Sequence, residues 1–136
     1  MLQKLHTRRG GFTLVEIMIV VAIIALLAAI AVPGFLRARK RAQATKVLNE
    51  LRLIDSALDQ YAVENNLVTG NAVTLTTLKG FFKVGTPLYQ TGATSLAGVD
   101  HDQNLVVDSL PIVPAAANTA LSDVVDQTFW TPYLVK

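Results

Sequence analysis

The stretch GGFTLVEIMIVVAIIALLAAIAVPGFL, residues 10–36, dictates the structure of the N-terminal part of this chain. Of the 25 residues from Phe12 to Leu36, only Glu16 is charged. At about 1.5 Å per residue, a helix of this length spans about 37 Å, enough to cross a hydrocarbon core of about 30 Å. A charge inside such a helix costs roughly 2.5–3.5 kcal/mol on insertion scales. The sequence therefore predicts a membrane-spanning helix in which Glu16 has a charged partner or a functional role.

Composition and charge describe the whole chain as one modest domain with segregated charge. Its 136 residues are 51% hydrophobic, and cysteine is absent, which excludes disulfides and thiolate metal ligation. Residues 1–11 carry a net charge of +3, residues 37–52 carry +5, and the residues beyond 52 carry −5. The order is a basic tip, an apolar segment, a basic collar (residues 37–52) and a mildly acidic head.

Three common kinds of N-terminal segment each explain only some of these features. A secretory signal peptide has an apolar core of about 7–15 residues; Ala29-Ile30-Ala31 would supply its cleavage site, but the apolar run is too long and contains Glu16. A twin-arginine signal would use Arg8-Arg9, but Gly10-Gly11 follow where apolar residues are expected. A simple membrane anchor explains the length of the run but neither the two glycines nor the glutamate.

The residues Gly11-Phe12-Thr13-Leu14-Val15-Glu16 follow a short basic leader and begin an unbroken apolar run. This combination resembles the class III signal of type IV pilins and type II secretion pseudopilins. The resemblance implies that a prepilin peptidase cleaves after Gly11 and methylates the new N-terminal residue, Phe12. Glu16 falls on the glutamate that this family has at the fifth mature position. The head, from about residue 67, resembles this family much less than the N-terminal segment does.

Glu16 is interpreted as an assembly residue. After cleavage, the α-amino group of Phe12 is a cation one helical turn from the Glu16 of its own chain. In a staggered bundle, the Glu16 of one subunit can meet the Phe12 amine of its neighbour. In hydrocarbon this pairing is worth more than in water, because each unpaired charge is expensive there. The alternative is a carboxylate that merely reaches the membrane interface.

Pro33 is interpreted as a second assembly residue. Together with Gly34 it lies near the outer end of the apolar run, where proline removes an N–H and clashes with the preceding turn. We therefore expect a kink or local melting of the helix, which packed helices use to bend around one another. The alternative is that Pro33 only marks the exit from the membrane.

Helical periodicity continues beyond the apolar run and predicts one helix from residue 12 to about residue 65, where Asn65, Asn66 and Gly70 are stop signals. An apolar stripe with spacings of three and four residues is expected to bury against the head of the same chain, with a coiled-coil partner as the second choice. The stripe consists of Ala44, Val47, Leu51, Ile54, Leu58 and Tyr61.

The predicted organisation has four parts: a removable leader at 1–11, a transmembrane and filament-core helix at 12–36, an amphipathic continuation at 37–66, and a globular β-rich head at 67–136. In the head, Phe81 and Phe82 are expected in the core, and a short helix between 114 and 127. The expected strands are Val73–Thr76, Leu105–Val107, Leu110–Val113 and, closing the sheet, Phe129–Val135, with Pro111 and Pro114 favouring edge or turn positions. The fold class is thus α+β: a long kinked N-terminal helix with a small antiparallel sheet packed on its second half.

The sequence shows none of the familiar catalytic or cofactor-binding motifs. His101 is the only histidine after the leader, and no G-x-S-x-G, phosphate loop or dinucleotide fingerprint occurs. We therefore expect neither catalysis nor a cofactor.

One weak metal site can be read from Asp100, Asp102, Asn104 and Asp108, whose spacing resembles the opening of a calcium loop. Leu105 and Pro111 stand where an EF-hand has glycine and glutamate, so the motif is incomplete. Some pseudopilins of the major class bind calcium through C-terminal aspartates. A solvated polar turn is the favoured alternative.

The resemblance implies a structural subunit of a type IV pilus-like or type II secretion pseudopilus filament. It would begin in the inner (cytoplasmic) membrane as a single-pass protein with a cytoplasmic N-terminus, and end in a periplasmic or cell-surface filament. Its implied partners are further copies of itself in a helical homopolymer, the prepilin peptidase, the inner-membrane assembly platform with its ATPase, and the bilayer before assembly.

Two questions stay open at this point. The alternative function is a membrane-anchored or secreted binding domain whose N-terminus is only a tether or signal, and the choice between pilus and pseudopilus is not made. The basic collar is not expected to bind nucleic acid, because no aromatic residue is interleaved between Arg37 and Arg52. A solvated face, or pairing with the acidic heads of a filament, is favoured.

Overall fold

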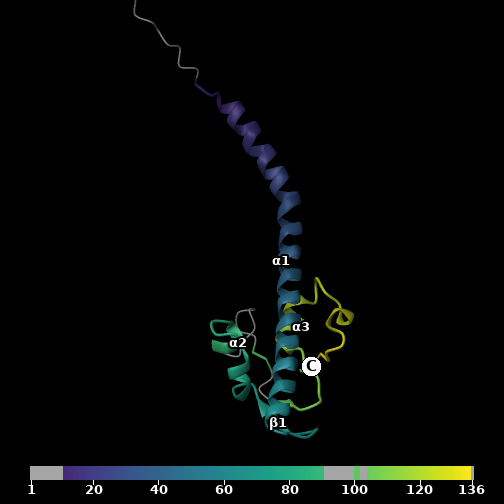
Figure 1. The fold of residues 1–136 in the computed structure, drawn as a ribbon. Coiled ribbons are helices and arrows are strands. Elements are labelled where there is room, and N and C mark those ends of the chain that lie inside the picture. The colour runs from purple at the N-terminus through teal and green to yellow at the C-terminus, as the bar shows by residue number, and fades with distance from the viewer. Residues whose placement is uncertain (1–10, 91–99, 102–103, 136) are drawn as a thin grey trace, which may run out of the picture. The chain divides into compact units, whose positions relative to one another are not determined.

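The computed structural model describes residues 11–90, 100–101 and 104–135. Its dominant element is α1 (Leu14–Glu64), a helix of 51 residues (Figure 1). The helix is long and apolar enough near its N-terminus to cross a membrane. The chain divides into two compact units, Met1–Leu36 and Arg37–Lys136, and α1 contributes to both.

In the first unit, α1 continues through Pro33 without interruption. The local melting expected at this residue is therefore wrong, while the kink stays a prediction. The physical reason is that a proline removes a single i→i−4 hydrogen bond, and the bonds of the neighbouring turns remain.

In the second unit, α1 buries one face. The stripe predicted from the sequence is confirmed, with Tyr61 partly buried at its end and Leu48, Ala57 and Ala62 widening it. Its fully or nearly fully buried members are Ala44, Val47, Leu51, Ile54 and Leu58. Because these apolar side chains lie against other segments of this unit, α1 is the central element of the head's core.

The first lobe packs against the later part of α1, from Ile54 to Ala62. It contains β1 (Ala72–Thr74), η1 (Thr77–Phe81), α2 (Pro87–Gln90) and β2 (Asn104–Val106). The two strands pair antiparallel with Val73 opposite Leu105, and both of these side chains point into the core. Phe82 is buried in this lobe and Phe81 packs at its edge, so the core aromatics expected from the sequence are confirmed.

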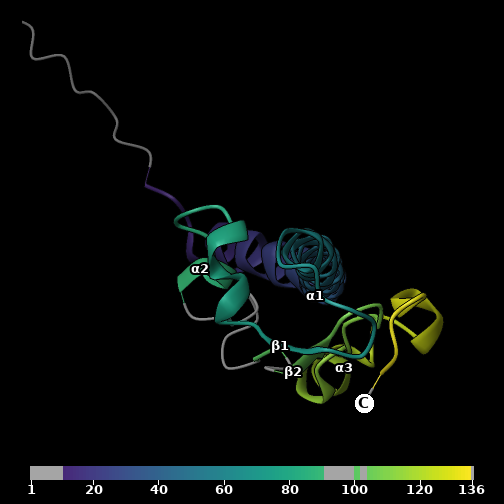
Figure 2. The same cartoon turned by 60° about the horizontal axis from the view of Figure 1, so that its bottom comes forward.

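The second lobe packs against the earlier part of α1, from Ala44 to Leu51. It contains α3 (Ala115–Leu121) and η2 (Gln127–Trp130), and α3 confirms the short helix expected between 114 and 127. Trp130 is fully buried at its centre. In Figures 1 and 2, α2 and α3 lie on different sides of the second part of α1, and Figure 2 shows β2 beside α3.

Two of the four expected strands are wrong. In place of strands at 110–113 and 129–135, the structure has a single parallel bridge between Val113 and Val135, and η2 covers Gln127–Trp130. Pro111, Pro114 and Pro132 each remove a backbone N–H that a sheet ladder needs. The described sheet therefore has two strands, and the head remains α+β.

Candidate assembly site

Glu16 forms a reciprocal cap with Thr13 at the start of α1. Its Oε2 accepts hydrogen bonds from the backbone N–H of Thr13 at 2.7 Å and from Thr13 Oγ1 at 2.9 Å. The backbone N–H of Glu16 in turn donates to Thr13 Oγ1 at 3.2 Å. Since α1 begins at Leu14, these are the N-cap and N3 positions of a capping box. The T-x-x-E signal stands in the sequence, and sequence reasoning overlooked it.

The cap leaves part of the carboxylate available. Both Thr13 donors reach Oε2, and none of the hydrogen bonds between described residues reaches Oε1. Glu16 is therefore held in position by its own chain with one oxygen able to accept a further donor. A further cation can bind there without first breaking the cap.

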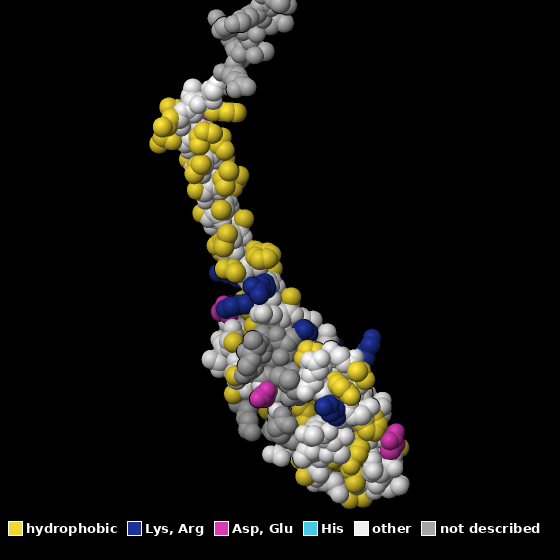
Figure 3. All heavy atoms as spheres, turned by 90° about the vertical axis from the view of Figure 1, so that its left-hand side faces the viewer, with side chains coloured by type: hydrophobic (Ala, Val, Ile, Leu, Met, Phe, Trp, Pro, Cys, Tyr) yellow, Lys and Arg dark blue, Asp and Glu magenta, His cyan; other side chains and the backbone are white. Residues whose placement is uncertain are grey.

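Apolar side chains cover α1 after this cap. Phe12 is 84% exposed, and every described residue from 11 to 36 is exposed in the single chain. Figure 3 shows these side chains as a nearly continuous apolar surface on the N-terminal part of the helix. An exposed apolar surface of this extent is typical of a site that contacts a membrane or another protein. Pro33 lies within this exposed segment, and its role in assembly stays a prediction.

The basic collar is partly occupied by the head of its own chain. Lys40 Nζ lies 2.7 Å from Asp123 Oδ2, and Arg41 Nε donates to the carbonyl oxygen of Val124 at 3.4 Å. The hydrogen bond from Lys40 lowers the pKa of the Asp123 carboxyl, and the charge of Arg37 contributes. These contacts, 83 residues apart in the chain, fasten the second lobe to the first turns of α1 in this unit.

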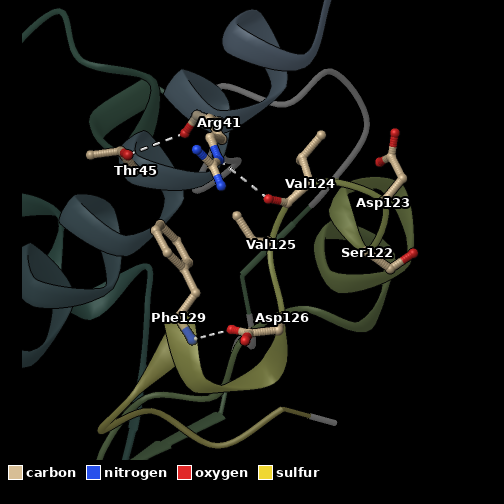
Figure 4. A pocket seen from close by; sticks show the side chains of 8 residues that line it. All are labelled: Arg41, Thr45, Ser122, Asp123, Val124, Val125, Asp126 and Phe129. Atoms are coloured by element: carbon tan, nitrogen blue, oxygen red, sulfur yellow. Dashed lines mark hydrogen bonds between the residues drawn. The ribbon is translucent and has the colours of Figure 1, made fainter.

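A groove of about 600 Å³ lies between α1 and the second lobe (Figure 4). Arg41 and Thr45 line it on the helix side, and Val125 and Phe129 line it on the lobe side. Asp126 in its wall is committed locally, because it accepts hydrogen bonds from Thr128 Oγ1 and from the backbone N–H of Phe129. Those two bonds lower the pKa of Asp126, and the bond from Phe129 makes Asp126 the N-cap of η2.

A buried polar pair joins α1 to the segment before β2. His101 Nε2 lies 3.3 Å from Glu50 Oε2, and their side chains are 1% and 7% exposed. Sequence reasoning noted His101 only as an isolated histidine and placed Glu50 among the polar residues on other faces of the helix. No local signal identifies such a pair, because the partners are 51 residues apart.

The four calcium candidates are only partly placed by the structure. Asp102 lies outside the described residues, Asp100 and Asn104 are exposed, and Asp108 accepts a hydrogen bond from Thr69 Oγ1. Within the described ranges, no group of three acidic, histidine or cysteine side chains is arranged to hold a metal. Calcium binding thus stays a prediction from the sequence.

Comparisons with known proteins give partial matches. A family model for the prokaryotic N-terminal methylation motif matches residues 6–32. The type IV wide pilus major component PilA4 of Thermus thermophilus is 46% identical over 68 residues, 50% of this chain and 52% of that protein. The type II secretion system core protein G of Aeromonas hydrophila is 36% identical over 59 residues, 43% of this chain and 41% of that protein. The core protein G of Vibrio cholerae is 35% identical over 64 residues, 47% of this chain and 44% of that protein. No solved structure gives a significant match.

This chain spans about half the length of the curated relatives it matches, between 41% and 52% for these three. The matched motif contains the predicted processing residues Gly11 and Phe12 as well as Glu16. This chain therefore carries the N-terminal methylation motif, and part of it is similar to a type IV pilus component and to type II secretion system core proteins G.

Proposed function

We propose that this chain is a structural subunit of a type IV pilus-like or type II secretion pseudopilus filament, polymerised through its N-terminal helix. The observation that carries the proposal is the exposed apolar part of α1 with a capped Glu16 at its start, inside the methylation motif. Such a surface suits a bilayer before assembly and neighbouring helices afterwards. Relatives named for a pilus and for a secretion system support both kinds of filament.

Assembly would start from a processed membrane protein. We propose that the prepilin peptidase cleaves after Gly11 on the cytoplasmic side of the inner membrane, and that an assembly platform with its ATPase then extracts the subunit. The motif supports this orientation. The distribution of Lys and Arg alone does not, because the basic collar is at least as basic as the leader.

Processing gives the first test. The mature chain is expected to start at N-methyl-Phe12, since Gly11-Phe12 is the junction inside the matched motif. The intact mass of the protein extracted from membranes should show the loss of residues 1–11 and the gain of one methyl group. A mass that begins at Val32 would instead establish ordinary signal-peptide cleavage after Ala31.

The alternative function, a binding domain on a tether, predicts processed protein that never polymerises. Shearing or pelleting of filaments from cells that produce the chain separates the two functions. Neither function requires a catalytic residue or a cofactor, and we propose that the chain has none.

Calcium gives a separate test of the Asp100–Asp108 segment. Millimolar calcium should leave the melting temperature of the purified protein unchanged, because we favour a solvated turn over a metal site. A rise in melting temperature with calcium that Asp102→Ala removes would contradict this expectation and establish the site, since a ligand stabilises the state it binds.

A further inference from the structure

Two pairs of opposite charge occur on one face of α1. Arg37 and Arg41 are four residues apart, as are Asp55 and Asp59, and each aspartate follows its arginine by 18 residues. Eighteen residues make about five turns of an α-helix, so both pairs point to the same side, about 27 Å apart. All four residues lie in the regular helix of the second unit.

The arginine pair keeps donors available. Arg37 is exposed, and the nearby Asp123 is already bound by Lys40. Arg41 uses Nε for the Val124 carbonyl, which leaves its two terminal nitrogens for another acceptor. Among the described residues, neither arginine has a carboxylate oxygen within 4 Å.

The aspartate pair forms no ion pair with a described cation of its own chain. Asp59 is exposed and Asp55 half-buried, and neither has a cation within 4 Å among the described residues, although Arg52 lies three positions before Asp55. Burial and the charge of Asp59 raise the pKa of Asp55. Like charges at i and i+4 destabilise a helix, so this pair would gain from an external cation.

We propose that the Arg37–Arg41 pair of one copy binds the Asp55–Asp59 pair of a second, parallel copy displaced by about 27 Å along the helix axis. Equal spacing within the pairs lets Arg37 meet Asp55 while Arg41 meets Asp59. The inference rests on the proposed filament and specifies a contact between its heads. One chain cannot make this contact with itself, because the straight helix holds the pairs apart.

The geometry also fixes the kind of assembly. The two pairs are different surfaces of the same molecule, so the contact is heterologous, and each copy has one of each surface left for the next copy. Such a contact extends into a filament, whereas a two-fold contact would stop at a dimer.

Engineered disulfides test the contact in the full-length, membrane-produced chain, which has no cysteine of its own. The variant Arg37→Cys with Asp55→Cys should, after oxidation of sheared filaments, give a ladder of covalent dimers, trimers and longer species. The two positions in one chain are about 27 Å apart, and a disulfide needs Cα atoms within about 7 Å. Every bond in the ladder must therefore join two copies.

The matched control is Arg39→Cys with Asp55→Cys, because Arg39 points to the opposite side of the helix and should give no ladder. Each single variant should give no species beyond a dimer. If the unmodified chain forms filaments but the variant with cysteines at positions 37 and 55 gives no ladder, this contact is overturned and the proposed function is left intact. Absence of filaments from the unmodified chain would overturn the proposed function itself.

Charge exchange provides a second measurement that does not depend on oxidation. Arg37→Glu and Asp55→Lys should each lower the filament yield several-fold relative to processed subunit in the membrane. Their combination should restore most of that yield, because the opposite charges meet again. All three variants should accumulate in the membrane like the unmodified chain. If the combined variant then gives no higher filament yield than the worse single variant, the contact is overturned. If Asp55→Lys does not accumulate, the same charge exchange is made between Arg41 and Asp59 instead.

Discussion

Replacing Glu16 by valine is expected to abolish filaments while processed subunit accumulates in the membrane. The substitution removes an intramembrane charge that costs roughly 2.5–3.5 kcal/mol on insertion scales, so the helix should insert at least as well as before. Cleavage after Gly11 should continue because the junction is unchanged. Assembly should fail, because the incoming Phe12 amine then enters hydrocarbon without a carboxylate to bind.

The capping box gives this experiment its matched control. In Glu16→Gln, the amide oxygen can still accept the two hydrogen bonds from Thr13, so the cap survives while the charge is lost. If Glu16 acts through its charge, the glutamine variant should lose filaments like the valine variant. If Glu16 acts only by capping α1, the glutamine variant should assemble normally.

The measurement is the ratio of sheared or pelleted filament to processed subunit in the membrane fraction. We expect that ratio to fall below one tenth of the unmodified value in both variants, since a tenfold change corresponds to about 1.4 kcal/mol and an unpaired charge in hydrocarbon costs more. Normal filament yield with valine at position 16 would rule out the assembly role.

The long helix and its buried stripe could be predicted from sequence because both depend on local periodicity. Apolar residues recur every three or four positions from Ala44 to Tyr61, and that spacing places them on one face regardless of what covers it. The core positions Val73 and Leu105 lie in short apolar and β-branched segments, and this composition predicted strands there.

The C-terminal part of the head could not be predicted in the same way. The residues Phe129 to Val135 are rich in aromatic and β-branched types, yet Trp130 is buried from a short 3-10 helix and Pro132 stands beside it. Composition favoured a strand, whereas the structure buries Trp130 from η2 and Pro132 removes a backbone N–H that a strand would need. Such tertiary control of a short segment leaves no periodic signal.

The polar contacts of the candidate site also differ in how far they could be predicted, because some are local in sequence and others are not. The Thr13–Glu16 cap is local and could have been found from its spacing. The contacts of Lys40 with Asp123 and of His101 with Glu50 join residues 83 and 51 positions apart. Only the packing of both lobes against α1 brings these partners together.

The dependence of both lobes on α1 leads to the second large effect: a fragment of residues 67–136 should not fold, whereas residues 37–136 should form a stable, largely monomeric head. The shorter fragment loses the α1 side of both clusters, including Val47, Leu51, Ile54 and Leu58. Burying each such side chain contributes about 1.5–3 kcal/mol. Four of them approach the whole stability of a domain, about 5–15 kcal/mol.

Circular dichroism and gel filtration of both fragments measure this effect, and a neighbouring pair of leucines controls it within the longer fragment. Leu51 is fully buried, and Leu51→Ala should cost about 2–5 kcal/mol of unfolding free energy. Leu53 is 55% exposed, and Leu53→Ala should change that free energy by less than about 0.5 kcal/mol, as surface substitutions do. Equal effects of the two substitutions, or a cooperative melting transition for residues 67–136, would contradict an architecture in which α1 is the core of the head. Phe82 and Trp130 are 7% and 0% exposed when α1 is present. Without α1 they become accessible to solvent, so this architecture predicts that the shorter fragment aggregates.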